Sequence, residues 1–173
     1  FQTLIAISVP KLHEFIAQYI EVCNPAHVFV CSGSETDLQY IRDMAIKNKE
    51  EAKLSIDGHT VHFDSNADQA RDKQGTKFLL SKKEDLGSFV NSMDRDEGLT
   101  EINGLLNGIM VGKEMLVTLF CLGPTDSRFS IPCIQITDSA YVAHTEDVLY
   151  RQGYRLFKNM NYWDPFFKFV HSE

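Results

Sequence analysis

The sequence predicts an α/β fold in which a mixed β-sheet is flanked by helices. Three observations support this class. Apolar residues recur at helical spacing over residues 9–23, and two apolar segments typical of buried strands, residues 115–122 and 131–136, lie close together. Helix and strand patterns are also mixed along the chain without strict alternation. With 173 residues the chain can bury a sizeable core, and we expect residues 1–173 to form a single domain.

The first element is an amphipathic helix over residues 9–23. Its apolar side chains share one helical face, at Leu12, Phe15, Ile16, Tyr19, Ile20 and Cys23. We expect Ser8 to cap this helix, because its hydroxyl can accept a hydrogen bond from a free backbone N–H, and Pro10 suits the first turn. Asn24-Pro25 should end the helix, since the residue before a proline disfavours helical geometry.

A short buried strand is expected next, over residues 27–31, followed by a second helix over residues 36–50. Ser32-Gly33-Ser34 turns the chain between them. The apolar face of this helix would consist of Leu38, Ile41, Met44 and Ala45. Asp57-Gly58 is a strong turn dipeptide, so residues 54–63 should form a hairpin.

Strands and helices continue to mix in the rest of the chain. The remaining strands are expected over residues 76–80, 115–122 and 131–136. The remaining helices are expected over residues 84–92, 99–110 and 143–150. Residues 154–173 are rich in large aromatic and aliphatic side chains, which would be sticky if left bare. We therefore expect this segment to dock, either on this domain or on further chain.

Composition narrows the class of protein. The net charge of −7 repels phosphate backbones, so no nucleic acid is expected as a partner. No run of about 18 apolar residues is present, so no membrane span is expected, and the first ten residues lack the basic start of a signal peptide. The four cysteines lie in apolar contexts without a CxxC pair. We expect reduced thiols in a cytoplasmic protein.

One glycine-rich stretch superficially suggests a phosphate loop. Gly104, Gly108 and Gly112-Lys113 follow one another closely. A phosphate loop requires Gly-x4-Gly-Lys-Ser/Thr, but Asn107 stands at the first glycine position and Glu114 replaces the hydroxyl that would hold magnesium. A carboxylate there would repel phosphate. The stretch is better interpreted as a helix end with a glycine cap.

The sequence also lacks a metal-binding pattern. His59 and His62 would lie on opposite faces of a strand and so would not chelate together easily. The acidic stretch 92–98 resembles the start of a calcium loop only loosely, because Leu105 stands where the loop needs a glutamate. A solvated loop is expected for residues 92–98, and no metal ligand and no catalytic residue is assigned in this chain.

Arg71 is the residue that we single out. It lies in the segment DQARDKQGTK, residues 68–77. A loop arginine flanked by aspartates is usually solvated or weakly paired, and the residues alone favour that interpretation. A guanidinium is nevertheless planar, permanently charged and able to offer paired donors to a carboxylate.

The block GPTDSRFSIPCIQITDSAYV, residues 123–142, resembles the N-terminal domain of the GTP-dependent phosphoenolpyruvate carboxykinases. That family has a Gly-Pro-x-x-Ser loop, then a strand, then Thr-Asp-Ser-x-Tyr-Val. Gly33-Ser34-Glu35 and residues 108–120 are similar to other segments of the family. Residues 164–172 resemble a family helix that ends in His-Ser. The resemblance implies the carboxykinase N-terminal-domain fold.

The resemblance also implies a function. The family has an Asp-x-Ala-Arg segment whose arginine binds the carboxylate of oxaloacetate or phosphoenolpyruvate, which makes Arg71 the expected substrate-binding residue. The family's glutamate two residues later, which helps hold a lid closed, aligns with Lys73 or has shifted through an apparent one-residue insertion. Either Asp72 substitutes for that glutamate or the coupling to the lid differs.

The whole enzyme of this family converts oxaloacetate and GTP to phosphoenolpyruvate, carbon dioxide and GDP. It uses Mn²⁺ and Mg²⁺ with GTP, and its metal ligands, phosphate loop and guanine pocket follow the segment present here. The resemblance therefore implies the substrate-side lobe of a longer enzyme, with a missing C-terminal nucleotide-binding domain as its partner. We expect this fragment alone to be inactive and to hold no cofactor.

Two alternatives remain open. A non-catalytic ligand-binding or protein-interaction domain of the same fold would use the aromatic segment 154–173 as a docking surface. A small unrelated enzyme with a spatially assembled triad is the other, because triad geometry cannot be read from sequence.

Overall fold

The computed structural model describes residues 2–64, 75–161 and 164–173. They form two compact units. The larger unit combines the chain up to His62 with the chain from Gly108 onward, and the smaller unit covers residues 63–107. The predicted α/β class, with a mixed sheet flanked by helices, is confirmed. Within the described residues, no helix is long and apolar enough to cross a membrane.

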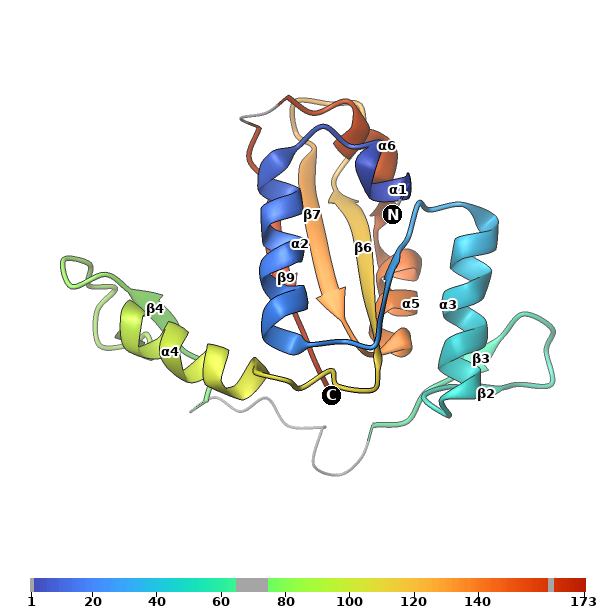
Figure 1. The fold of residues 1–173 in the computed structure, drawn as a ribbon, viewed down its shortest axis with the longest axis horizontal. Coiled ribbons are helices and arrows are strands. Elements are labelled where there is room, and N and C mark those ends of the chain that lie inside the picture. The colour runs from blue at the N-terminus through green and yellow to red at the C-terminus, as the bar shows by residue number, and fades with distance from the viewer. Residues whose placement is uncertain (1, 65–74, 162–163) are drawn as a thin grey trace. The chain divides into compact units, whose positions relative to one another are not determined.

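A five-stranded mixed sheet forms the centre of the larger unit (Figure 1). β1 (His27–Val30) runs parallel to β6 (Glu114–Leu122), and β6 runs antiparallel to β7 (Ile131–Thr137). β9 (Phe167–Val170) is parallel to β7 at the other end of the sheet. β8 (Arg151–Gln152) pairs with the end of β6.

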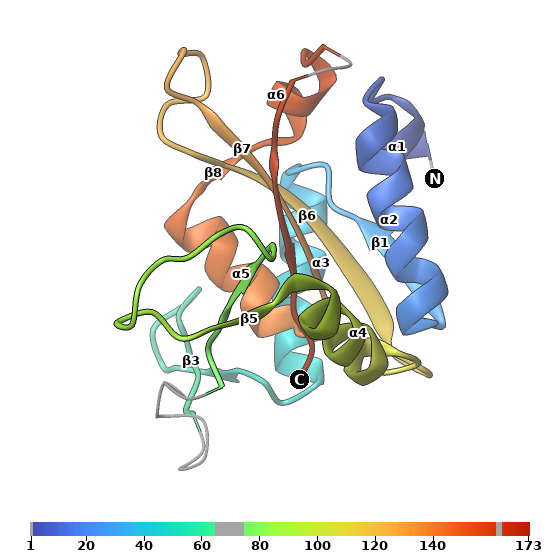
Figure 2. The same cartoon turned by 90° about the vertical axis from the view of Figure 1, so that its left-hand side faces the viewer.

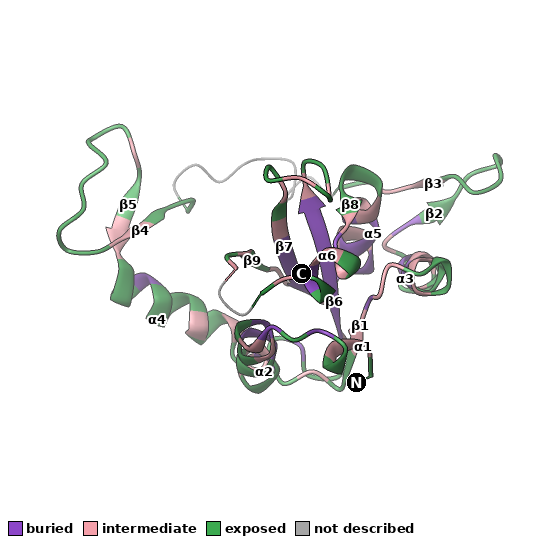
Figure 3. Cartoon of the chain, turned by 90° about the horizontal axis from the view of Figure 1, so that it is seen from above, coloured by how far each residue is buried: buried purple, intermediate pink, exposed green. Residues whose placement is uncertain are grey.

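The apolar sequence of β6 follows from its place in the sheet. β6 has a neighbour on each side and helices over both faces, so every residue from Met115 to Cys121 is buried. Figure 3 shows the burial concentrated on β6 and β7. The strands predicted over 115–122 and 131–136 are confirmed. β1 is confirmed as a strand, but the burial expected for it is wrong, because at the sheet edge β1 stays half exposed.

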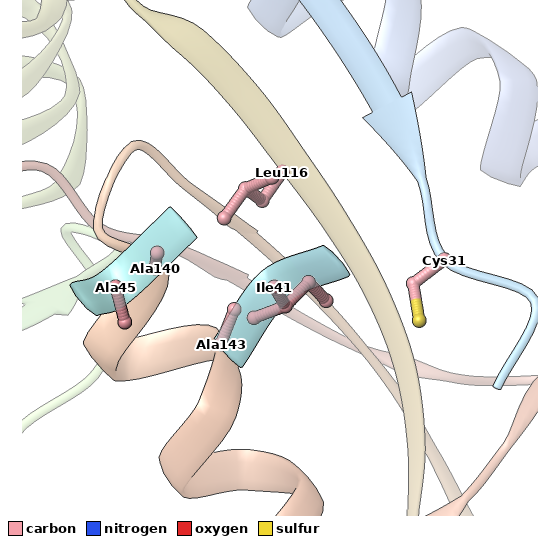
Figure 4. Close-up of a cluster of buried hydrophobic side chains, with 6 residues drawn as sticks. All are labelled: Cys31, Ile41, Ala45, Leu116, Ala140 and Ala143. Carbon is pink, nitrogen blue, oxygen red and sulfur yellow. The ribbon is translucent and has the colours of Figure 1, made fainter. Parts of the chain in front are cut away.

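Helices cover both faces of the sheet. α2 (Pro10–Cys23) lies on one face, whereas α3 (Glu35–Lys47) and α5 (Ala140–Leu149) lie on the other (Figures 1 and 2). Two short helices, α1 (Gln2–Ile5) and α6 (Tyr154–Lys158), complete the unit. Figure 4 shows the buried cluster beneath α3 and α5, which consists of Cys31, Ile41, Ala45, Leu116, Ala140 and Ala143.

The helix ends differ in part from the expectations. α2 is preceded by Val9, not by Ser8, as its N-cap, and no side chain caps it. The residue before a proline is driven to extended geometry, so Pro10 forces Val9 into this position. Asn24 ends α2 with a left-handed φ of 50°. Ser139 caps α5 by accepting from the Val142 N–H, so α5 begins three residues before the predicted start.

The predicted hairpin is present with shorter strands. β2 (Ala52–Lys53) and β3 (Thr60–Val61) pair antiparallel. The turn between them contains Gly58, whose φ of 74° suits a residue without a Cβ. The Leu54 N–H donates to the His59 carbonyl at 3.0 Å and closes the hairpin.

The smaller unit contains β4 (Phe78–Leu80), β5 (Ser92–Asp94) and α4 (Arg95–Leu106), with β4 parallel to β5. The strand over 76–80 is confirmed. The helix predicted over 84–92 is wrong, because Gly87 adopts a φ of 81° and interrupts any helical run.

The solvated loop expected over 92–98 is also wrong. This stretch ends β5 and starts α4, where Asp94 accepts from the N–H groups of Asp96 and Glu97 at 3.0 and 3.2 Å. Acidic residues are favoured in the first turn of a helix for two reasons. They accept hydrogen bonds from its free N–H groups, and their negative charge is attracted to the positive end of the helix dipole. The helix predicted over 99–110 therefore begins earlier.

Gly153→Ala should destabilise the full-length protein by about 2 kcal/mol, because overpacking a core costs about 1–3 kcal/mol. A Cβ at Gly153 would lie 2.8 Å from the backbone N, C and O atoms of Phe120, and backbone cannot rotate away. Urea unfolding measures the change in the free energy of unfolding. Gly104→Ala is the matched control, since a Cβ there meets nothing within 4 Å. Equal stability of the two variants would contradict the prediction.

Candidate functional site

The block that carries the family resemblance begins with a closed loop between β6 and β7. Ser130 is central to this loop. Its hydroxyl bonds the carbonyls of Pro124 and Ser127, and it accepts from the Ser127 N–H at 3.2 Å. Arg128 lies over the ring of Phe129, 4.9 Å from its centre, on the exposed side of the loop. These contacts give the loop a fixed shape that links two strands.

The Thr-Asp-Ser segment at the end of β7 organises the start of α5. Thr137 Oγ1 accepts from the Ser139 N–H at 3.0 Å, and Ser139 Oγ bonds Glu50 Oε2 at 3.0 Å. The same Glu50 oxygen accepts from the Tyr141 N–H at 2.7 Å. The segment therefore joins β7 and α5 to the turn that follows α3, which is about 90 residues away in the sequence.

Asp138 connects this segment with the last described residues. Its side chain is only 1% exposed and accepts from Lys113 Nζ at 2.6 Å, Ser172 Oγ at 2.8 Å and the Glu173 N–H at 3.0 Å. The helix expected over residues 164–172 is wrong. The stretch contains β9, because its alternating side chains suit a sheet and the His171 N–H donates to the carbonyl of Ile136.

A cleft of about 580 Å³ lies beside this network, between α3 and the start of β6. Tyr40 lines it and donates to Glu114 Oε2 at 2.8 Å. Its charged lining residues are Asp43, Lys47, Glu50, Lys113, Glu114, Asp138 and Glu173. Carboxylates outnumber ammonium groups, and Lys113 is already paired with Asp138. A dicarboxylate substrate would be repelled here, so we do not assign this cleft as the substrate site.

The phosphate-loop interpretation fails on the same contacts. Lys113 is paired with Asp138, and Glu114 accepts from Tyr40. Gly108 follows the end of α4 with a φ of 71°, as expected of a glycine at a helix end.

Cys31 and Cys133 are not poised as nucleophiles. Burial raises the pKa of Cys31 to about 11 and that of Cys133 to about 11, so both stay protonated near neutral pH. All four cysteines are free. Thr137 Oγ1 lies 3.0 Å from His171 Nδ1, but Thr137 is fully buried and no substrate could reach it.

Two buried acidic groups were missed by sequence reasoning. Glu51 Oε1 lies 2.7 Å from His144 Nδ1, and this buried pair joins the start of β2 to α5. Glu146 is buried against β6 and accepts from Thr118 Oγ1 at 2.5 Å. No sequence signal marks these positions, since charged residues usually indicate the solvent face of a helix. Across the described ranges, no group of three or more His, Cys, Asp or Glu is placed to hold a metal ion.

Arg71, the substrate-binding residue expected from the resemblance, lies outside the described residues. The same holds for Asp72 and Lys73. The role of Arg71 therefore stays a prediction.

Comparisons with known proteins support the family resemblance that the Thr-Asp-Ser block carries. The chain is 50% identical over 172 residues to phosphoenolpyruvate carboxykinase [GTP] of Thermococcus sibiricus, and 51% identical over 172 residues to the enzyme of that name from Pyrococcus horikoshii. Each match covers 99% of this chain and 28% of the relative. An enzyme of the same name from Chlamydia caviae is 32% identical over 164 residues, 93% of this chain and 27% of the relative.

The chain thus spans little more than a quarter of the length of the curated relatives that it matches. A family model described as the phosphoenolpyruvate carboxykinase N-terminal domain matches residues 14–173. This match includes the whole described sheet, α3, α5 and the part of α2 from residue 14 onward. The chain belongs to the family of phosphoenolpyruvate carboxykinase N-terminal domains.

Proposed function

We propose that this chain is the substrate-side domain of a GTP-dependent phosphoenolpyruvate carboxykinase. The observation that supports this most strongly is the identity of about 50% over 99% of the chain with two enzymes of that name. The proposed reaction of the whole protein converts oxaloacetate and GTP to phosphoenolpyruvate, carbon dioxide and GDP.

The reaction has two bond changes. The bond between C3 and C4 of oxaloacetate breaks, carbon dioxide leaves, and the electron pair forms the enolate of pyruvate. The enolate oxygen on C2 then attacks the γ-phosphorus of GTP, and the bond to the bridging oxygen breaks to release GDP. The orientation of the substrate carboxylates decides whether the C3–C4 bond is aligned with the C2 carbonyl group. A cation held at a fixed place in the oxaloacetate site can set this orientation.

Arg71 is the proposed cation. Its guanidinium would bind a substrate carboxylate through two parallel N–H···O bonds, which fix direction as well as charge. Either the neighbouring Asp72 would take the place of the family's lid-contacting glutamate, or the coupling to the lid would differ. The cleft beside Asp138 is a poor alternative for a dicarboxylate, because its lining is mostly acidic.

Divalent metal ions, Mn²⁺ and Mg²⁺ with GTP, would stabilise the negative charge of the enolate and of the transferred phosphoryl group. Within the described ranges no three His, Cys, Asp or Glu side chains are grouped to hold such an ion. In this proposal the chain binds and orients oxaloacetate. The nucleotide would be bound by a C-terminal domain of the longer protein.

The test is an assay of the full-length protein with oxaloacetate and GTP, following phosphoenolpyruvate. We expect turnover with GTP and none from the 173-residue chain under the same conditions. Replacing GTP by ATP tests the nucleotide preference. A full-length protein that yields no phosphoenolpyruvate with either nucleotide would overturn the proposal and favour a non-catalytic ligand-binding or interaction domain.

A further inference from the structure

β9 leaves one edge of the sheet open. It is the end strand of the order β1-β6-β7-β9 and pairs only with β7 among the described strands. The His171 N–H donates to Ile136, so by alternation Phe167 and Phe169 also direct their backbone groups toward β7. The N–H and C=O groups of Lys168 and Val170 consequently point to the open side.

This edge lacks the usual protection of exposed edge strands. Native edges are commonly blunted by a proline, a bulge or an outward lysine. The sequence of β9 is FKFV, without proline, and its register with β7 is uninterrupted. Lys168 does not guard the edge, because its Nζ lies over the rings of Phe15 and Phe166, at 5.2 and 5.3 Å from their centres.

An aromatic strip lies beside the open edge. Phe169 contacts Phe120 with ring centres 6.0 Å apart, and Tyr150 stacks on Phe120 at 4.9 Å. Phe120 is buried, but Tyr150, Phe169 and Phe167 are 37%, 42% and 61% exposed. Phe167 and Phe169 on one face of β9, together with Tyr150 at the end of α5, form an exposed aromatic surface that favours association.

We propose that an extended segment of the longer polypeptide, outside residues 1–173, adds to β9 as a further strand and covers Phe167, Phe169 and Tyr150. Main-chain hydrogen bonds to Lys168 and Val170 would fix this strand, and its alternate side chains would pack on the aromatic strip. The occupant would be apolar at every second position.

The length of the relatives favours this occupant over a second copy. The chain covers 28% of each of two relatives, so most of such a protein is attached to this unit. A tethered segment acts at an effective concentration of about millimolar, far above that of a separate copy in solution. The inference depends on family membership and not on the proposed activity, so it can fail or succeed separately.

Photo-crosslinking of the full-length protein tests the proposal. Phe167 is replaced by p-benzoylphenylalanine in a mixture of isotopically light and heavy protein, and crosslinked peptides are identified by mass spectrometry. We expect crosslinks within one copy to a peptide outside residues 1–173. Crosslinks between light and heavy copies, crosslinks only within residues 1–173, or no crosslink would each overturn the proposal. p-Benzoylphenylalanine at Phe129, which is 65% exposed, is the matched control and should not capture that peptide.

Hydrogen exchange of the unmodified full-length protein gives a second measurement that avoids any folding defect of the variant. The amides of Lys168 and Val170 should exchange at least about 100-fold more slowly than in an unstructured peptide. The Phe169 amide, which faces β7, should be protected in the same way and serves as the internal reference. Exchange of Lys168 and Val170 at the rate of an unstructured peptide, with Phe169 protected, would show an open edge and contradict the proposal.

Discussion

Arg71→Ala in the full-length protein should lower kcat/KM for oxaloacetate by about 10²–10³-fold. The variant would lose two charge-assisted hydrogen bonds to a carboxylate, and one such bond contributes about 1.5–3 kcal/mol. With each bond in the lower part of that range, losing both costs about 3–4 kcal/mol, and each 1.36 kcal/mol corresponds to a tenfold change in rate. Steady-state kinetics with varied oxaloacetate at saturating GTP provide the measurement.

Arg71→Lys separates charge from geometry. The lysine keeps one positive charge but not the planar pair of donors, so we expect a loss of about tenfold, smaller than that of Arg71→Ala. The matched control is Arg128→Ala, which removes an exposed guanidinium from the loop between β6 and β7 and should leave the kinetics unchanged. Unchanged kinetics of Arg71→Ala would remove Arg71 from the site.

Glu146→Gln should stabilise the full-length protein at pH 8 by about 3 kcal/mol and have little effect at pH 4. Burial raises the pKa of Glu146 from 4.5 to about 7, and the hydrogen bond from Thr118 opposes this only in part. A difference of one pKa unit corresponds to about 1.36 kcal/mol, and glutamine keeps the shape without the charge.

The sign follows from proton binding. Between pH 4.5 and about 7 the folded protein keeps the Glu146 proton, while the unfolded chain has released it. The contribution of Glu146 to the free energy of unfolding therefore falls as the pH rises through this window and is constant on either side. Urea unfolding from pH 4 to pH 8 should show this fall in the parent and a flatter profile in Glu146→Gln.

Glu21→Gln, on the exposed side of α2, is the control and should follow the parent at each pH. Thr118→Val should raise the pKa of Glu146 further, because it removes the hydrogen bond that favours the charged carboxylate. Parallel profiles of the parent and Glu146→Gln would show that Glu146 is not the titrating group.

Elements whose signal is local were predictable from the sequence. β6 is a continuous apolar run, and α2 repeats its apolar residues at helical spacing, so both were found without knowledge of the fold. The helix expected over 84–92 failed, because Gly87 takes a left-handed conformation that apolar spacing does not reveal. Asp94 was misinterpreted because a capping aspartate and a solvated one look alike in sequence.

The candidate site was less accessible to sequence reasoning. The bonds from Asp138 to Lys113 and Ser172 join residues distant in the chain, and side-chain chemistry alone does not select such partners. Glu146 carries the same chemistry as a surface glutamate, and only packing against β6 distinguishes it. Arg71 was selected by resemblance, since a loop arginine has no local pattern of its own.

The pairing of β1 with β6 has a consequence for biosynthesis. Residues 27–30 must wait for residues 114–117 before the sheet can form, because β6 supplies its central strand. As the chain leaves the ribosome, α2 and α3 emerge with their apolar faces uncovered, and the whole 63–107 segment is translated before their partner strand exists. Such non-local pairing slows folding and prolongs exposure of apolar surface, so the nascent chain should depend on chaperones until β7 has been made.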